Sequence, residues 1–402
     1  MHNKLFPVYE VGSMPKLNAR VKAFRTQSNN TINDEDLQQI KNLAKKVQID
    51  SKDILETLLQ QKKDGRKLTK EEKQRVADFN ALLNLKLQEI CGLDFVYDGE
   101  ARRCEMYRHC AKQIKGFEDY PEMLRSRGPD SWLASICSDV PTLNTHQDNI
   151  PEVKELQFVK KHAKNSIKVP LDDPYMIANM TGNRYFIEKF ESTYDQEPQK
   201  LRYESKRALT LAIAQNVIRP QVEALVQSGA NFIQLDIPSA TIDLQHMPIM
   251  VEGINTVTRG FHKTKFSLHI CYPKRVSLIN KTGYELLFPH ILKLNENVDH
   301  LSIELANGNQ YREDLSIFAK YQRERKFELG IGVIDITLER QIKNLLETPE
   351  EVRDRILLSV EILKDPLLIY VAPDCGLRQV SLERTIEVFD TLSKGAELAR
   401  KG

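Results

Sequence analysis

Short runs of apolar and β-branched residues alternate along the chain with longer segments in which apolar residues recur every three or four positions. The short runs are typical of buried β-strands, and the longer segments are typical of amphipathic helices. Strands that alternate with helices in this way favour a parallel sheet with crossover helices. Eight strands are expected, and they predict an α/β fold, a (β/α)8 TIM barrel that forms a single catalytic domain over residues 1–402. The expected strands are Phe6–Val11, Asp94–Asp98, Ile167–Leu171, Phe232–Leu235, Lys265–Ile270, His300–Ile303, Leu329–Ile334 and Leu368–Val371.

One stretch, residues 31–89, does not fit a minimal barrel because it has few β-forming residues and many Lys, Glu, Gln and Leu. Its apolar spacing predicts three successive helices. The second follows Asp50-Ser51, and the third begins at Thr69 with Glu72 in the capping-box position. We interpret this stretch as a helical insertion between the first two strands. It could be a solvent-facing cover for the barrel, or it could supply a docking surface or a lid.

The charge of the chain is nearly balanced, with 58 basic and 56 acidic side chains and a net charge of +2. This balance argues against a nucleic-acid partner. No apolar run approaches the ~20 residues of a membrane span, and the N-terminus lacks the apolar segment of a signal peptide. Six cysteines are too few for a disulfide scaffold in a chain of 402 residues, so reduced thiols are expected. These features predict a cytoplasmic protein without a membrane partner.

Candidate metal ligands lie where expected strands end, which is where barrel enzymes carry their active sites. His269 and Cys271 are one residue apart, so on a strand both side chains point to the same face and could hold one ion. A core histidine beside a core cysteine is the alternative. Glu304 lies between Ile303 and Leu305 and needs a partner, a cation or water.

Cys375 lies in a Pro-Asp-Cys-Gly turn that directly follows an apolar strand. It is the strongest single candidate ligand, because the turn holds a thiol at a strand end. Two thiolates together with an imidazole favour zinc over magnesium or calcium. The residues therefore suggest a zinc site assembled from three separate strand ends.

Seven motifs in order along the chain resemble the catalytic half of the cobalamin-independent methionine synthases. That family consists of zinc enzymes built on a (β/α)8 barrel, and this chain resembles its short, single-barrel members. The main stretch outside the resemblance is residues 31–73. The matching motifs are Val11-Gly12-Ser13, Gly92 to Glu100 followed by Arg103 and Met106, Ile233 to Pro238, His269 to Tyr272, Ile303-Glu304, Gly330 to Asp335, and Pro373 to Leu377.

The resemblance implies a zinc-dependent methyltransferase that transfers a methyl group to the thiol of homocysteine and forms methionine. Its metal ligands would be His269, Cys271, Glu304 and Cys375. The resemblance also implies that Ser13, Glu100 and Asp236 hold the amino-acid end of homocysteine. The chemistry agrees, because an ammonium group needs an anion and a carboxylate needs donors such as the backbone N–H groups of a turn. The alternative for the two acids is a salt bridge in the barrel mouth.

Several departures from the family pattern concern the methyl donor. Thr337 replaces a histidine that protonates the leaving folate, and Met180 falls near a tryptophan that stacks on the pterin. Ile242 replaces a glutamate, with Asp243 beside it. Methyltetrahydrofolate leaves only when its amine is protonated, so we favour a methylcorrinoid donor, carried by a corrinoid protein that could dock on the helical insertion. The alternatives are an alkyltransferase for another small thiol similar to coenzyme M, and a catalytically silent barrel with a structural zinc site.

Overall fold

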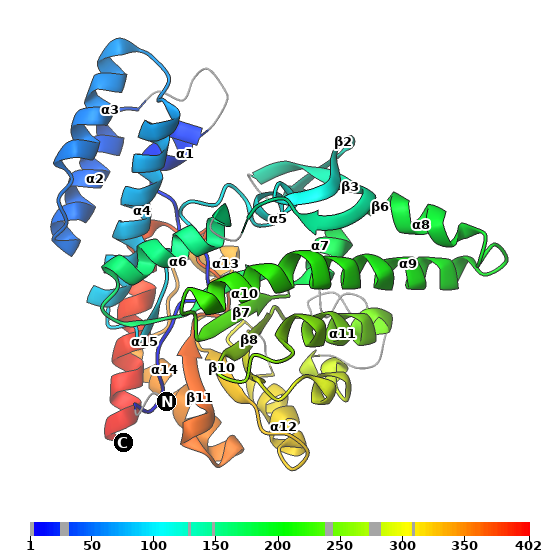
Figure 1. Ribbon diagram of the computed structural model, residues 1–402. Helices are drawn as coiled ribbons and strands as arrows, with labels where there is room; N and C mark the ends of the chain where they lie inside the picture. Colours follow the sequence, from blue (N-terminus) through cyan, green and yellow to red (C-terminus); the bar gives the residue numbers. More distant parts are fainter. Residues whose placement is uncertain are drawn as a thin grey trace.

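Six parallel strands form the regular part of the sheet in the computed structural model. They are β5 Val169–Asp172, β7 Phe232–Asp236, β8 Lys265–Ile270, β9 Val298–Ile303, β10 Glu328–Gly332 and β11 Ile369–Ala372. Their order is β11-β10-β9-β8-β7-β5 (Figure 1). The structure describes residues 4–24, 32–127, 130–146, 149–237, 244–272, 283–307 and 310–402. Because the strands run parallel and in sequence order, their carboxyl ends meet at one end of the sheet.

Two shorter segments extend this sheet toward a ring. β1 (Phe95–Val96) pairs in parallel with β4 (Ser166–Ile167), which leads directly into β5. Between them, the N–H of Lys168 donates to the carbonyl of Val96 at 3.3 Å. One predicted strand, Ile167–Leu171, is therefore divided between β4 and β5, and the other predicted strands after the first lie within two residues of the observed ones.

The first expected strand, Phe6–Val11, is the main correction to the predicted barrel. It makes only isolated parallel bridges, from Val8 to β11 and from Tyr9 to β1. The backbone of Phe6 is left-handed, with φ 52°, and Pro7 has no N–H to donate, so a longer ladder cannot form there. The segment nevertheless lies between the last and the second strand, as the predicted (β/α)8 arrangement requires, and that fold class is confirmed.

Helices pack around the outside of this sheet (Figure 1). Each presents a buried apolar stripe, such as Val352, Ile356 and Leu363 on α14. A π-helical turn, η2 (Ala214–Ile218), joins α9 to α10 just before Pro220, whose missing N–H disturbs the α-helical ladder. The larger helices here are α6 Pro151–His162, α9 Pro198–Ile213, α10 Arg219–Gln227, α11 Met247–Thr258, α12 Tyr311–Tyr321, α14 Pro349–Leu363 and α15 Leu382–Lys401.

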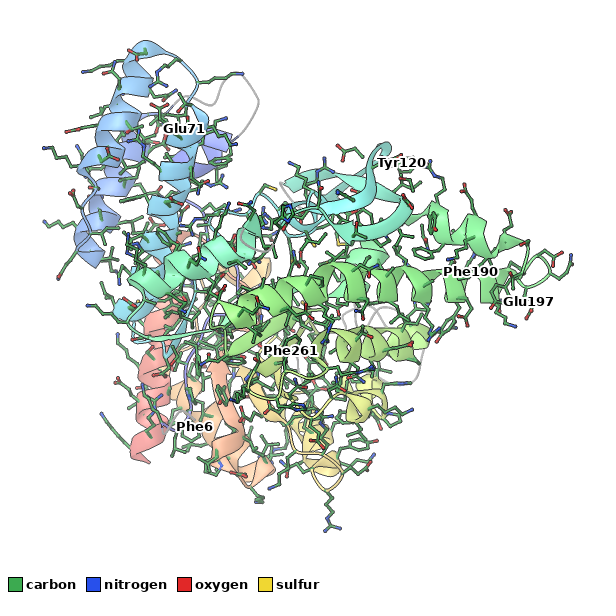
Figure 2. All side chains as sticks on the ribbon, in the orientation of Figure 1. Phe6, Glu71, Tyr120, Phe190, Glu197 and Phe261 are labelled. Carbon is green, nitrogen blue, oxygen red and sulfur yellow. The ribbon has the colours of Figure 1, made fainter. Side chains whose placement is uncertain are left out.

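The three helices predicted for residues 31–89 are present between the first strand segment and β1. They are α2 (Asp34–Val47), α3 (Lys52–Asp64) and α4 (Lys70–Ile90), and they stand beside the barrel, where Glu71 is labelled (Figure 2). The predicted capping box of Thr69 and Glu72 begins α4. At the start of α3, the side chain of Asp50 caps the N–H of Lys52 at 2.9 Å, whereas Ser51 makes no side-chain cap. The division of the chain into one domain with this insertion stays a prediction.

An antiparallel hairpin, β2 (Ile114–Arg127) and β3 (Asp130–Leu143), was not predicted. The short strand β6 (Gly182–Asn183) joins it in parallel, and α8 (Arg184–Glu191) follows. The hairpin contains register shifts that break the alternation of apolar and polar residues. The remaining short elements are α1 Asn18–Phe24, α5 Met106–Ala111, α7 Pro174–Met180, η3 Leu244–His246, η4 Gly283–Leu287, η5 His290–Lys293, α13 Leu338–Ile342 and η6 Pro366–Leu368.

Two expectations about the chain as a whole can be compared with the fold. Within the described residues, which include all six cysteines, no disulfide forms, as predicted. Cys91, at the end of α4, is buried, whereas Cys104 is exposed. Among the helices that the structure describes, none combines the length and the apolar composition needed to cross a membrane.

Candidate active site

His269 and Cys271 lie together, as strand parity predicted. His269 is the fifth residue of β8, and Cys271 follows directly after the end of that strand. Both side chains point to the same side, with Nε2 of His269 3.7 Å from Sγ of Cys271. Burial differs, because His269 is 4% exposed and Cys271 is half-buried. This pair therefore forms one half of a cluster that faces the carboxyl end of the sheet.

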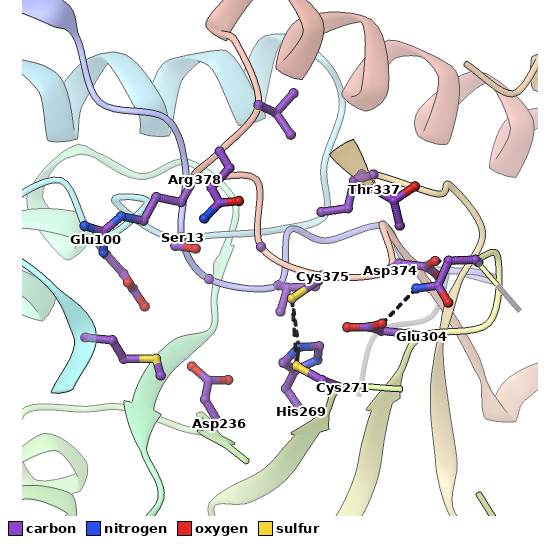
Figure 3. Close-up of a pocket in the computed structure, with 18 of the residues that line it drawn as sticks. Ser13, Glu100, Asp236, His269, Cys271, Glu304, Thr337, Asp374, Cys375 and Arg378 are labelled. Carbon is purple, nitrogen blue, oxygen red and sulfur yellow. Dashed lines mark hydrogen bonds between the residues drawn. The ribbon is translucent and has the colours of Figure 1, made fainter. Parts of the chain in front are cut away.

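Cys375 and Glu304 complete the cluster from two other strand ends (Figure 3). Sγ of Cys375 lies 4.0 Å from Sγ of Cys271 and 3.6 Å from Nε2 of His269. Glu304 follows β9 directly, and one ligand atom from each of the four residues lies within 4.8 Å of the others. The structure thus brings together all four residues that the sequence suggested as metal ligands.

The donor set of this cluster fits a zinc ion. Tetrahedral zinc with Zn–S of about 2.3 Å and Zn–N of about 2.0–2.1 Å separates neighbouring donors by about 3.5–3.8 Å. The three separations among His269, Cys271 and Cys375 are 3.6, 3.7 and 4.0 Å. Two thiolates, an imidazole and a carboxylate also match the ligand types that zinc prefers. These residues could therefore hold zinc with little rearrangement.

The protein side chains of the cluster strongly perturb one another. Hydrogen bonds from Cys271 and then from His269 hold the pKa of Cys375 well below its usual value. Burial alone would lower the pKa of His269, but its hydrogen bond and charge interaction with Cys375 raise it to about 9. Burial, followed by the charge of Cys375, raises the pKa of Glu304 to about 7. This crowding of thiolate and carboxylate favours a bound cation.

Asp374 stabilises the loop that carries Glu304, a role that the sequence pattern did not indicate. Its carboxylate accepts the N–H groups of Leu305 and Ala306, each at 2.9 Å, and of Asn307 at 2.7 Å. The side-chain amide of Asn307 in turn donates to Oε2 of Glu304 at 2.8 Å. Asp374 therefore ties the loop after β9 to the turn that carries Cys375. The acid next to Cys375 was visible in the sequence, but its backbone partners come from another strand end.

A cavity of about 460 Å³ opens onto the cluster (Figure 3). Ser13, Glu100 and Asp236, the residues predicted to hold an amino acid, line it together with the four candidate ligands. Nη1 of Arg103 donates to Glu100 at 3.3 Å. Burial raises the pKa of Asp236 to about 6, although the nearby His269 opposes this shift. The cavity thus brings the four candidate metal ligands and the acidic side chains of Glu100 and Asp236 into one space.

Two of the residues that depart from the family pattern also line the cavity. Thr337 and Met180 both line it, with Ile336 and Gln341 beside Thr337. The N–H of Thr337 donates to Oδ1 of Asp335 at 2.8 Å, which fixes the backbone there. The side chain of Thr337 offers no group that could protonate a leaving amine near neutral pH. Ile242 and Asp243, the other departures, lie outside the described residues.

Comparisons with known proteins agree with this geometry. A family model described as "Cobalamin-independent synthase, Catalytic domain" matches residues 50–399. A methionine synthase from Sulfurisphaera tokodaii is 29% identical over 338 residues, which are 83% of this chain and 86% of that protein. A methionine synthase from Thermococcus kodakarensis is 30% identical over 320 residues, which are 79% of this chain and 81% of that protein.

Two solved structures share the fold. A B12-independent methionine synthase from Shewanella sp. W3-18-1, in complex with selenomethionine, aligns with a TM-score of 0.67 and 21% identity over 83% of this chain and 91% of its own. A putative vitamin-B12 independent methionine synthase from Listeria monocytogenes aligns with a TM-score of 0.60 and 18% identity over 99% of both chains. At these identities the likeness concerns the fold alone.

Proposed function

Because the chain belongs to the cobalamin-independent methionine synthase family, we propose that it transfers a methyl group to the thiol of homocysteine and forms methionine. It is a methionine synthase-like methyltransferase. The observation that carries the specific proposal is the shared cavity, which is lined both by the four candidate zinc ligands and by the carboxyl groups of Glu100 and Asp236. A thiol bound at the ligands can therefore belong to a molecule whose ammonium group reaches Glu100 and Asp236.

In this proposal different residues bind the amino-acid end of homocysteine and position its thiol. Glu100 and Asp236 bind the ammonium group, and the turn at Gly12-Ser13 offers the N–H of Ser13 to the carboxylate. Asp374 and Asn307 keep Glu304 in place beside the two cysteines. These contacts fix the direction of the thiol, so that its sulfur faces an incoming methyl group.

His269, Cys271, Glu304 and Cys375 would hold the zinc ion. A bound zinc ion lowers the pKa of a coordinating thiol, so that homocysteine reacts as its thiolate. Two cysteine thiolates and a carboxylate give the site a surplus of negative charge, and the added thiolate therefore stays electron-rich. The sulfur forms a bond to the methyl carbon, the bond between that carbon and the donor breaks, and the donor keeps its electron pair. The thiol proton leaves to solvent.

We propose a methylcorrinoid as the methyl donor in preference to methyltetrahydrofolate. Thr337 and Met180 both line the cavity, and neither can protonate a leaving amine. A corrinoid leaves without protonation, so it makes no such demand on the protein. A corrinoid protein would need a docking surface, for which the helices α2–α4 are the candidate.

Two alternative functions can be compared with the cavity. An alkyltransferase for a sulfonate thiol similar to coenzyme M would gain nothing from the carboxylates of Glu100 and Asp236, which line the cavity. A silent barrel with a structural zinc site would be expected to enclose its ligands, whereas all four candidate ligands line the cavity here. Both observations favour catalysis on an amino-acid thiol.

The experiment is a calorimetric titration of the zinc-loaded protein with homocysteine in buffers of different ionisation enthalpy. We expect binding with release of about one proton per thiol, because a free thiol with a pKa near ~8.5 is mostly protonated at neutral pH. Methionine should then form when methylcobalamin is added. Absence of both homocysteine binding and proton release would refute the proposed function.

A further inference from the structure

A buried lysine interacts electrostatically with carboxyl groups that line the cavity. Lys168, between β4 and β5, is 2% exposed, although lysine is among the residues least often buried. Its Nζ donates to the carbonyl of Val11 at 2.8 Å and to Oε1 of Gln234 at 2.5 Å. It also lies 4.3 Å from the ring centroid of Tyr9. This charge therefore touches the turn that leads to Ser13.

Gln234 connects Lys168 to Asp236 through hydrogen bonds. This glutamine is fully buried on β7, and its Nε2 donates to Oδ1 of Asp236 at 2.7 Å and to the carbonyl of Val11 at 2.6 Å. Both residues point to the same side of the strand, because they are two positions apart. Lys168 orients the amide of Gln234, and that amide orients the carboxylate of Asp236.

Glu10 adds an anion to the same group. It is 3% exposed, and Oε1 has no hydrogen-bond partner among the described residues. Burial raises its pKa to about 7, while the charge of Lys168 and a hydrogen bond with the backbone of Gly12 oppose that shift. Glu10 and Lys168 therefore both form hydrogen bonds with the backbone of the turn from Val11 to Ser13.

Several ionisable groups surround this turn. Glu10, Glu100 and Asp236 are three carboxyl groups, and each influences the others electrostatically. Cations near these groups include Lys168 and Arg103, and Arg103 is also paired with Glu155 at 2.9 Å. An α-ammonium group in the cavity would interact favourably with the carboxyl groups that line it.

We propose that Lys168 and Gln234 are positioning residues that fix Asp236 and the turn before Ser13, and so give the enzyme its preference for a thiol that carries an α-ammonium group. The inference rests on the proposed function and names the part of the substrate that these residues select. A merely structural lysine would stabilise the barrel without affecting this selection.

The test compares two ligands on the zinc-loaded protein. Homocysteine is matched with 4-mercaptobutanoate, which has the same thiol and carboxylate but lacks the amino group. The wild-type protein should bind homocysteine more tightly, and Lys168→Met and Gln234→Leu should each reduce that preference by about 10-fold or more, as expected for hydrogen bonds to a charged group. The affinity for 4-mercaptobutanoate and the zinc content should stay within about twofold.

Lys265→Met is the matched control. Lys265 is another lysine of the barrel strands, and it interacts with Glu328 and Tyr370 away from the cavity. Its replacement should change the stability of the fold and leave the ratio of the two affinities unchanged. If Lys168→Met does not fold, Gln234→Leu carries the same test without removing a charge.

The possible results distinguish the positioning role of Lys168 and Gln234 from the proposed function. Equal weakening of both ligands, or an unchanged ratio in both variants, would overturn the positioning role of Lys168 and Gln234. A wild-type protein that binds neither thiol would instead refute the proposed function. Loss of the preference in both variants, with zinc retained, would support the inference.

Discussion

Sγ of Cys271 and Sγ of Cys375 lie 4.0 Å apart, although 104 positions separate the two residues in the sequence. The two thiols reach each other because β8 and β11 end at the same end of the sheet. A pair of thiolates at this distance is close to the spacing that a shared zinc ion imposes. Both thiols should therefore be needed for the protein to retain zinc.

Replacement of Cys375 by Ser should remove zinc binding and methyl transfer together. Even residues that only support metal ligands change affinity by about 10–100-fold, so loss of a ligand should cost more than about 100-fold. Zinc per chain, measured by elemental analysis after dialysis against a weak chelator, checks this. Cys104→Ser is the control, because Cys104 is exposed and lies outside the cluster. Full zinc retention in Cys375→Ser would contradict the assigned ligand set.

The methyl donor can be identified from initial rates with the wild-type protein. We expect methylcobalamin to support methionine formation and methyltetrahydrofolate, with one or several glutamates, to be at least about 10-fold slower, because the side chain of Thr337 cannot protonate the leaving amine. Methionine is measured by mass spectrometry with zinc content determined in parallel. Folate-dependent turnover of about 1 per second would show that the interpretation of Thr337 and Met180 is wrong.

Asp173 predicts a specific dependence of stability on pH. It is fully buried at the start of α7, accepts the N–H of Met176 at 2.8 Å, and burial raises its pKa to about 7 from the ordinary value of 3.8. The folded protein thus keeps a proton that the unfolded chain loses. The stabilising effect of that proton is complete below the ordinary pKa and disappears as the pH rises through about 7.

Asp173→Asn should therefore gain stability relative to the wild type between pH 5 and pH 8, by roughly 2–3 kcal/mol. Asparagine caps helices about as well as aspartate, so the cap itself is retained. Urea unfolding of both proteins at the two pH values measures the difference, and effects of the metal site cancel between them. Asp195→Asn, at an exposed position, should show no such trend. A difference that stays constant with pH would contradict the prediction.

Gly332→Ala should weaken both the fold and the metal site. A Cβ at this position of β10 would collide with the carboxylate of Asp374 and lie 2.9 Å from the carbonyl of Ile303. Overpacking of this kind costs about 1–3 kcal/mol, and displacement of Asp374 would release the loop that holds Glu304. Urea unfolding and a competitive zinc titration measure the two effects. Unchanged zinc affinity would show that Asp374 does not control the position of Glu304.

Local patterns were sufficient to predict half of the candidate site. Strand parity alone places His269 and Cys271 on one side, because side chains two apart on a strand share a face. The proximity of Cys375 needed the further expectation of a barrel, in which separate strand ends meet. The eight-strand order follows from the alternation of elements, which records the topology directly in the sequence.

Other features depend on partners that are distant in the chain and leave no local signal. Nothing around Lys168 indicates that this lysine is buried, because its acceptors, Val11 and Gln234, come from different strands. The hairpin β2–β3, by contrast, pairs neighbouring segments, but it contains Gly116 and its register shifts interrupt the alternation that identifies strands.

The tie that Asp374 makes to the loop after β9 also concerns the order in which the protein is assembled. A chain folded only as far as β9 has His269, Cys271 and Glu304, but neither Cys375 nor the carboxylate that secures the loop carrying Glu304. Both arrive together, as adjacent residues after the last strand. Under the proposed zinc site, a chain that ends before the last strand would have three of the four ligands and would bind zinc more weakly than the complete chain.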